Sequence, residues 1–307
     1  MKKIIGSLAV VVLILACTYA GVSYYFSSKL LFPSLLNDEA LKAEYGPIIP
    51  GEVGLTAEAV TFPSRDRGIS LSGWWIEVPD SNRAFVLVHG RGTNKKALVG
   101  YAPLFIDRGI SVLMLDLRGH GESTPTFVTF GDKERNDVLG AMDFLAERGI
   151  GPEKKVGCFA LSMGATAAYL AAMEAGKSDP SSLDLLIFDS GIADVPNSIR
   201  VNSEKVVGAA TPFLLPGALV LARLRSGADF EAANPIAHAT DLSIPVLYIM
   251  CSGDEVVPFD DQKRLLDAYT GPKESLVFQD LGHHRGFREM RSEYERALAE
   301  FLTTHTF

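Results

Sequence analysis

Short apolar runs alternate with helix-like segments along most of the chain, and this alternation constrains the fold more than any other feature. Eight runs have the length and composition of strands: Leu55–Phe62, Ile69–Val78, Ala84–His89, Ser111–Leu117, Lys155–Leu161, Leu183–Asp189, Pro245–Cys251 and Ser275–Gln279. The last six are apolar at odd and even positions alike, which is expected of strands covered on both faces. The pattern predicts an α/β domain with a mainly parallel central sheet and an antiparallel pair at its start.

Helix-like segments separate these runs and should flank the sheet. They are Lys133–Glu147, Ala165–Ala175, Asp260–Tyr269 and the C-terminal Ser292–Leu302. The interval from Gly191 to Ala233 interrupts the alternation of strands and helices, and we expect it to form a helical cap insertion over one end of the sheet. Because no internal repeat or charged linker divides the chain, residues 58–307 are predicted to form one domain with the cap at about 191–233.

The N-terminus does not read as part of a globular domain. The stretch Ile4–Phe26 holds 23 residues without a charge, and as a helix it would reach about 34 Å, enough to cross a bilayer core. A secretory signal has an apolar core of only about 7–15 residues, so residues 1–29 are interpreted as a retained transmembrane anchor. Two alternatives stay open: a lipoprotein signal after which a lipidated Cys17 becomes the new N-terminus, and a cleaved signal sequence.

The flanks of this anchor predict its orientation. Lys2 and Lys3 precede the span and Lys29 alone follows it, which favours a single-pass protein with its catalytic domain on the extracytoplasmic side, periplasmic or extracellular. Residues 30–57, rich in proline and glycine, are predicted to form a neck and a loop that leads into the domain. A membrane is therefore an expected partner.

Charge and cysteine content exclude several classes of protein. Lys plus Arg number 29 against 37 for Asp plus Glu, a formal charge of -8, so a nucleic-acid partner is not expected. Three cysteines cannot form a disulfide framework, and Cys158 and Cys251 in apolar runs read as small buried hydrophobic residues. The sequence lacks HExxH, CxxC, EF-hand and phosphate-loop motifs, so neither a metal nor a cofactor is expected.

One serine lies at a junction typical of a catalytic nucleophile. Ser162 stands in Ala160-Leu161-Ser162-Met163-Gly164, between an apolar strand and an alanine-rich helix. A sharp strand-to-helix turn presents such a hydroxyl at the edge of the sheet and needs small residues two positions away on either side. The helix dipole then favours an oxyanion beside it. The alternative is a serine that only caps the helix.

Further motifs follow other strands, and together they resemble the α/β-hydrolase family. They are His89-Gly90-Arg91-Gly92, Asp116-Leu117-Arg118-Gly119-His120-Gly121-Glu122-Ser123, Ser252-Gly253-Asp254-Glu255-Val256-Val257-Pro258 and Leu281-Gly282-His283-His284. The set is similar to the branch of serine-aminopeptidase-like and monoacylglycerol-lipase-like hydrolases, some of which carry N-terminal membrane anchors. One departure is Ala160, where the family usually has glycine. The resemblance implies an α/β-hydrolase fold and a triad in the order Ser, Asp, His.

The family order selects the partners of Ser162. Asp254 follows the Pro245–Cys251 strand and is the expected acid, with Glu255 as the alternative. Aligning the family's Gly-His on Gly282-His283 selects His283 as the base, and His284 should then point elsewhere. Asp260 and Asp261 are expected to open the next helix.

The oxyanion hole should use two backbone N–H groups, those of Met163 and Arg91. The Arg91 guanidinium is expected to be solvated, with binding of an anionic substrate group as the alternative. His89 and His120 are expected to shape their loops through hydrogen bonds.

These residues predict a serine hydrolase that cleaves carboxylic esters through an acyl-enzyme. The expected substrate is a small-molecule acyl ester or a lipid. The alternatives are a serine peptidase or aminopeptidase, an acyl-thioesterase, and a catalytically dead membrane-tethered binding module. The apolar segment Thr211–Leu221 in the cap is interpreted as a ligand groove or membrane contact, or else as a helix that packs on the core.

Overall fold

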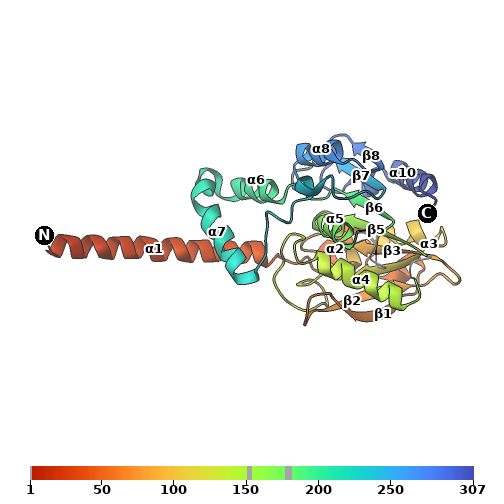
Figure 1. The fold of residues 1–307 in the computed structure, drawn as a ribbon, viewed down its shortest axis with the longest axis horizontal. Coiled ribbons are helices and arrows are strands. Elements are labelled where there is room, and N and C mark those ends of the chain that lie inside the picture. Colours follow the sequence, from red (N-terminus) through yellow and green to blue (C-terminus); the bar gives the residue numbers. More distant parts are fainter. Residues whose placement is uncertain (1, 151–153, 177–181) are drawn as a thin grey trace.

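The computed structural model describes residues 2–150, 154–176 and 182–307, and it contains one eight-stranded sheet (Figure 1). The strand order is β1-β2-β4-β3-β5-β6-β7-β8. The strands are β1 (Glu58–Pro63), β2 (Ser70–Ile76), β3 (Arg83–Val88), β4 (Ser111–Leu115), β5 (Lys155–Leu161), β6 (Leu185–Asp189), β7 (Val246–Cys251) and β8 (Lys273–Phe278). β2 pairs antiparallel with β1 and β4, and every other pairing is parallel. The predicted mainly parallel sheet is confirmed.

The sheet is covered by helices on both faces, as the apolar runs predict. Alternate residues of β3 enter two separate cores: Val86 and Val88 face one, and Phe85 and Leu87 face the other. The first core is closed by α4 (Arg135–Glu147), α5 (Met163–Ala175) and α8 (Phe259–Ala268). The second is closed by α3 (Pro103–Ile106) and α10 (Arg291–Thr304). Burial on both faces explains why these strands lack a polar face.

The last strand departs from that expectation. β8 lies at the edge of the sheet, and its Lys273 and Ser275 are exposed. Our prediction that this strand is covered on both faces is wrong for its amino-terminal half, whereas farther along Val277 packs against the first core and Phe278 lies in the second. An edge strand has only one neighbour, so the layers above and below it end there, and an exposed lysine discourages pairing with another chain.

The predicted cap is helical and lies beside the N-terminal helix. It consists of α6 (Val195–Val207), the 3-10 turn η3 (Gly208–Ala210) and α7 (Thr211–Ser226). α1 (Lys2–Leu31) projects from the domain as a long rod, and α7 crosses its carboxyl-terminal part (Figure 1). The helix continues five residues beyond Phe26, where the uncharged stretch ends. Met1, the first residue of the predicted anchor, lies outside the described residues.

The segment after α1 is more ordered than the predicted neck suggests. It contains α2 (Asp38–Tyr45) and the 3-10 turn η1 (Pro50–Val53). Asn37 caps α2 by accepting a hydrogen bond from the N–H of Ala40 at 2.9 Å, and Leu41 is fully buried. The remaining short helices are η2 (Lys95–Tyr101), η4 (Pro235–His238) and α9 (Gly286–Glu289). The neck therefore packs onto the domain and places Tyr45 near the loop that follows β8.

Candidate active site

Ser162 occupies a strained turn between β5 and α5. Its backbone has φ 53° and ψ -124°, a left-handed conformation that costs a non-glycine residue free energy and is typical of nucleophile turns. Gly164 permits the close approach that this turn requires. A Cβ at Gly164 would lie 2.9 Å from the carbonyl oxygen of Val88 and closer still to that of His89. Ala160, the departure from the family pattern, fits within the buried core.

The structure brings Ser162, His283 and Asp254 together. Nε2 of His283 lies 3.0 Å from Oγ of Ser162, and Nδ1 lies 2.7 Å from Oδ2 of Asp254. With a proton on Nδ1, the ring donates to the carboxylate and leaves Nε2 free to accept the serine proton. The Asp254 carboxylate is fully buried, and the His283 side chain is 13% exposed and lines the cavity in front of the serine.

Backbone donors fix the orientation of Asp254. Its Oδ1 accepts hydrogen bonds from the N–H groups of Val256 and Val257, both at 2.8 Å. Glu255, the alternative acid, is exposed. Asp260 and Asp261 lie in the first turn of α8, as predicted.

His284 has a different environment from His283. Its ring stacks on Tyr45 with 5.2 Å between ring centroids, and its Nε2 lies 3.2 Å from the tyrosine hydroxyl. Burial, and then the neighbouring His283, lower the pKa of His284 to about 3, so the ring is neutral at physiological pH. Sequence reasoning did not single out Tyr45, because no local motif marks a residue in the neck as a partner of the last loop.

A second buried carboxylate lies beneath the serine turn. Asp189 ends β6, and its backbone oxygen accepts from the N–H of Ser162 at 2.9 Å. Its side chain accepts from the Tyr294 hydroxyl at 2.7 Å and from Ser190 Oγ at 2.9 Å. Burial raises the pKa of Asp189 to about 6. The backbone of Asp189 therefore supports the serine turn, while its carboxyl group is held by Tyr294 and Ser190.

Two buried histidines hold the loop that follows β3. Nε2 of His89 accepts from the N–H of Leu117 at 3.0 Å, and Nε2 of His120 accepts from the N–H of Gly92 at 3.1 Å. Each therefore carries its proton on Nδ1, which faces a backbone carbonyl, that of Gly90 and that of Arg118 respectively. Burial lowers the pKa of His120 to about 4 and lowers that of His89 well below its usual range. The predicted loop-shaping hydrogen bonds are confirmed.

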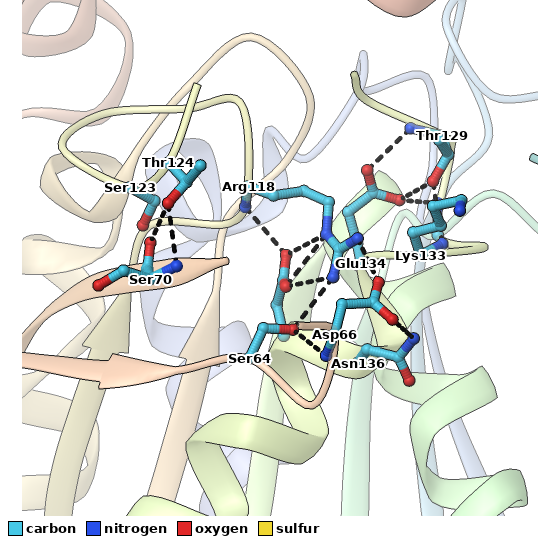
Figure 2. A network of polar contacts seen from close by, with 12 residues as sticks. Ser64, Asp66, Ser70, Arg118, Ser123, Thr124, Thr129, Lys133, Glu134 and Asn136 are labelled. Carbon is cyan, nitrogen blue, oxygen red and sulfur yellow. Dashed lines mark hydrogen bonds and ion pairs between the residues drawn. The ribbon is translucent and has the colours of Figure 1, made fainter. Parts of the chain in front are cut away.

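A buried ion pair anchors the loop that carries His120. Arg118 donates through Nη2 to Oδ1 of the fully buried Asp137 at 2.7 Å, and through Nη1 to Asp66 at 2.5 Å (Figure 2). Asp137 also accepts from the backbone N–H of Arg118 at 2.9 Å. Nearby, the Glu134 carboxylate accepts from Thr129 and from the N–H of Gly131, as Figure 2 shows for Thr129. These contacts hold in place the segment after β4, whose His120 binds the loop that follows β3.

The two predicted oxyanion donors flank Ser162. Met163 follows it at the first position of α5, and Arg91 lies in the β3 loop on the cavity wall. Within residues 2–150, 154–176 and 182–307, no acceptor engages the backbone N–H of either residue. Both N–H groups are therefore available to a ligand.

The side chain of Arg91 has a different role from either prediction. Its Nη2 donates to the carbonyl oxygens of Lys29 at 2.8 Å and Leu30 at 2.9 Å, in the last turn of α1. The guanidinium also lies over the ring of Phe130 at 5.0 Å, and burial lowers its pKa to about 10. The expectation of a solvated arginine is wrong, because the end of α1 covers it and supplies unpaired carbonyl acceptors.

Ser162 and His283 open into a cavity of about 800 Å³. The cap lines it with Ile199, Leu214, Leu215 and Ala218, and α1 lines it with Tyr25, Phe26, Lys29 and Leu30. Sequence reasoning assigned Tyr25 and Phe26 only to the predicted membrane anchor. The only local signal that these residues could also line a cavity is that the helix-compatible, partly apolar sequence continues to Leu31. Within the segment Thr211–Leu221, Leu214, Leu215 and Ala218 line the cavity, whereas Phe213 is exposed.

The structure contains three free cysteines, of which Cys158 and Cys251 are buried as predicted. Across the described residues, no group of three or more His, Cys, Asp or Glu side chains is placed to hold a metal ion. The same part of the chain has two helical stretches long and apolar enough to cross a membrane, Ile5–Leu31 and Val195–Ser226. The second is the cap, which packs against the domain.

Two relatives match the chain over most of its length. The protein YqkD of Bacillus subtilis is 26% identical over 306 residues, which cover 98% of this chain and 97% of the relative. Thiohydrolase aneE of Aspergillus aculeatus is 27% identical over 278 residues, covering 75% of this chain and 87% of the relative.

Solved structures and a family comparison agree with the fold. The esterase Pf2001 of Pyrococcus furiosus superimposes with a TM-score of 0.69 at 20% identity, covering 90% of this chain and 97% of the esterase. The sequence model of the alpha/beta hydrolase family matches residues 85–298. Since this match spans more than half of the sequence, the chain belongs to the α/β-hydrolase family.

Proposed function

We propose that this protein is a serine hydrolase that cleaves carboxylic acid esters. The observation that carries the proposal is the position of His283, whose two ring nitrogens lie 3.0 Å from the Ser162 hydroxyl and 2.7 Å from the Asp254 carboxylate. Nucleophile, base and orienting acid in this geometry are what acyl transfer requires. The order Ser162, Asp254, His283 is also the order of the family.

The mechanism follows from these contacts. Ser162 Oγ attacks the ester carbonyl carbon while its proton passes to Nε2 of His283. The bond from that carbon to the alcohol oxygen breaks, and the proton passes from His283 to the leaving oxygen. Water, deprotonated by His283, then hydrolyses the acyl ester on Ser162 and releases the carboxylic acid. Asp254 holds the ring in the required tautomer and stabilises the imidazolium that forms.

The negative charge of the tetrahedral intermediate would be stabilised by the free N–H groups of Met163 and Arg91. The amino terminus of α5 lies at the same place and adds its dipole. Loss of one such donor typically costs about 10²–10³ in kcat. Because the Arg91 donor is a backbone group, the contacts of His89 and His120 with its loop hold this half of the hole in place.

The same proposal includes attachment to a membrane by α1. Its apolar stretch Ile5–Leu31 is long enough to cross a bilayer, and Lys2 and Lys3 precede it. Contacts between α1 and α7 support a helix that is retained rather than cleaved. We place the catalytic domain on the extracytoplasmic side. Protease digestion of intact cells tests this orientation, since a domain on the outer side should be digested and a cytoplasmic one protected.

Thioesters are the second candidate substrates. The observation that favours them is the similarity to thiohydrolase aneE over 87% of that protein. A thioester would use the same nucleophile and base, because its leaving thiolate needs less protonation than an alkoxide. Peptide bonds, the third alternative, have a poorer leaving group and depend on protonation by His283.

The test is hydrolysis by the full-length protein in detergent, with and without Ser162. Ser162→Ala should lower kcat/KM for p-nitrophenyl butyrate by more than about 10³-fold, since the triad acts as a unit, and should abolish labelling by a fluorophosphonate probe. Ser292→Ala, at an exposed serine on α10, is the matched control. A panel of oxygen esters, thioesters and aminoacyl amides then ranks the three substrate classes. Activity of Ser162→Ala within tenfold of the parent would contradict the proposal.

A further inference from the structure

The cavity in front of Ser162 has a wall that the catalytic domain does not supply. Tyr25, Phe26, Lys29 and Leu30, from the last turns of α1, line it together with the cap. A membrane anchor needs only to hold a domain near the bilayer. Here the same helix is part of the chamber that faces the candidate nucleophile.

Contacts with the cap fix the position of this wall. A Cβ at Gly217 of α7 would lie 2.6 Å from the hydroxyl of Tyr19, so glycine permits the two helices to approach closely. The Tyr19 hydroxyl donates to the carbonyl oxygen of Phe213 at 3.0 Å. Arg225, near the end of α7, donates to Ser27 Oγ at 2.6 Å and Ser28 Oγ at 2.9 Å. α1 and α7 therefore form one unit.

The end of this unit is attached to the candidate oxyanion loop. Arg91 donates to the carbonyl oxygens of Lys29 and Leu30, and the N–H of Leu36 donates to the carbonyl oxygen of Gly92 at 2.9 Å. A change in the position of α1 would therefore move both a cavity wall and the loop that supplies an oxyanion donor. Arg91 is a positioning residue through its side chain.

The second cap helix exposes apolar side chains that do not line the cavity. Phe213, Val220 and Leu224 of α7 are 58–75% exposed, and α6 and α7 lie on the side of the domain from which α1 projects (Figure 1). Exposed apolar side chains gathered at one end of a domain are typical of a membrane contact. With α1 across a bilayer, this end of the cap would meet the lipid surface.

We propose that the last turns of α1 are part of the substrate-binding site and that the substrate is a long-chain acyl ester taken from the membrane surface. Its hydrocarbon chain lies between α1 and the cap, against Phe26, Leu30 and Leu215, with the ester carbonyl at Ser162. A volume of about 800 Å³ is within the usual range of ligand pockets, roughly 300–1,000 Å³. This inference rests on the proposed function of Ser162 as the nucleophile.

The experiment compares two chain lengths with the full-length protein in phosphatidylcholine vesicles. The readout is the ratio of kcat/KM for p-nitrophenyl dodecanoate to that for p-nitrophenyl butyrate. Phe26→Ala removes part of the α1 wall and should lower this ratio at least fivefold. Ala218→Phe fills the cavity from α7 and should lower it more than tenfold. Leu13→Ala is the matched control, because Leu13 lies on the same helix, is 63% exposed and does not line the cavity.

The possible failures are distinguishable. If butyrate is hydrolysed in a Ser162-dependent manner and neither Phe26→Ala nor Ala218→Phe changes the ratio, the α1 wall is overturned while the proposed function stands. If Leu13→Ala lowers the dodecanoate-to-butyrate ratio as much as Phe26→Ala does, the α1 wall is also overturned, because the effect would then come from the anchor in general. If neither ester is hydrolysed and a fluorophosphonate does not label Ser162, the proposed function itself fails, and the inference with it.

Discussion

Tyr45 lies nearly parallel to His284, with an angle of 18° between the rings and 3.2 Å between the tyrosine hydroxyl and Nε2. The two residues are 239 positions apart in the chain. The contact holds the second histidine of the pair against the neck, with a φ of 46°, and leaves His283 alone between Ser162 and Asp254. The two adjacent histidines thus have different environments in the folded protein.

The first prediction separates these two histidines. His283→Ala should lower kcat/KM for p-nitrophenyl butyrate by more than about 10³-fold, because it removes the base. His284→Asn should leave turnover measurable, since Asn accepts the left-handed conformation that His284 adopts. Steady-state kinetics of both variants check this. The reverse order of losses would show that His284 is the base.

The second prediction concerns the acid and its neighbour. Asp254→Asn should lower kcat by several orders of magnitude, because an amide no longer holds the histidine in the tautomer that accepts the serine proton. Glu255→Gln should stay within about twofold of the parent, since Glu255 is exposed and makes no contact with the ring of His283. Equal losses in the two variants would contradict the assignment of Asp254.

The third prediction tests the close approach behind the serine turn. Gly164→Ala should destabilise the protein by about 1–3 kcal/mol, because its Cβ would collide with the backbone of β3. Gly51→Ala is the control, since a Cβ there meets open space. Melting temperatures in detergent report the difference. Equal melting temperatures for the two variants would argue against the turn geometry described above.

The fourth prediction is a pH dependence that arises from Asp189. Its pKa is about 6 in the folded protein and about 3.9 when unfolded, so between these values the folded state keeps a proton that the unfolded state releases. The stability that this carboxyl contributes is complete below about pH 4 and is lost as the pH rises through 6. Two pKa units correspond to roughly 3 kcal/mol.

Asp189→Asn removes this titration and isolates its effect. The melting temperature of the variant minus that of the parent should rise between pH 4.5 and pH 7.5, because only the parent loses stability on ionisation. Other titrating groups contribute equally to both proteins and cancel. A difference that is constant or falls with pH would refute the role of Asp189.

The fifth prediction concerns the buried ion pair in Figure 2. Arg118→Met leaves Asp137 without its cation inside the protein and should cost about 3–5 kcal/mol of stability. Arg200→Met, in an exposed pair with Glu204, should cost no more than about 0.5 kcal/mol. Chemical denaturation of both variants provides the comparison. Adding Asp137→Leu to Arg118→Met should restore much of the loss.

Much of the fold could be predicted because its signals are local. Each strand is a run of apolar residues whose burial follows from its own composition, and all eight runs coincide with β1–β8 to within a few residues. The turn at Ser162 is also local, since it depends on small residues two positions away. The family order then predicted Asp254 and His283, and the structure places both beside Ser162.

By itself, the sequence determined the elements, their order and the residues at the ends of the strands. Only the tertiary structure decided that Arg91 binds the end of α1, that Tyr45 stacks on His284, and that Phe26 lines the cavity. The exposure of β8 at the edge of the sheet was likewise decided only by the tertiary structure. The physical reason is that hydrophobic periodicity reports whether a side chain is buried, not which element buries it. Contacts between residues 60 to 240 positions apart follow from how completed helices and strands pack, and no local pattern encodes that choice.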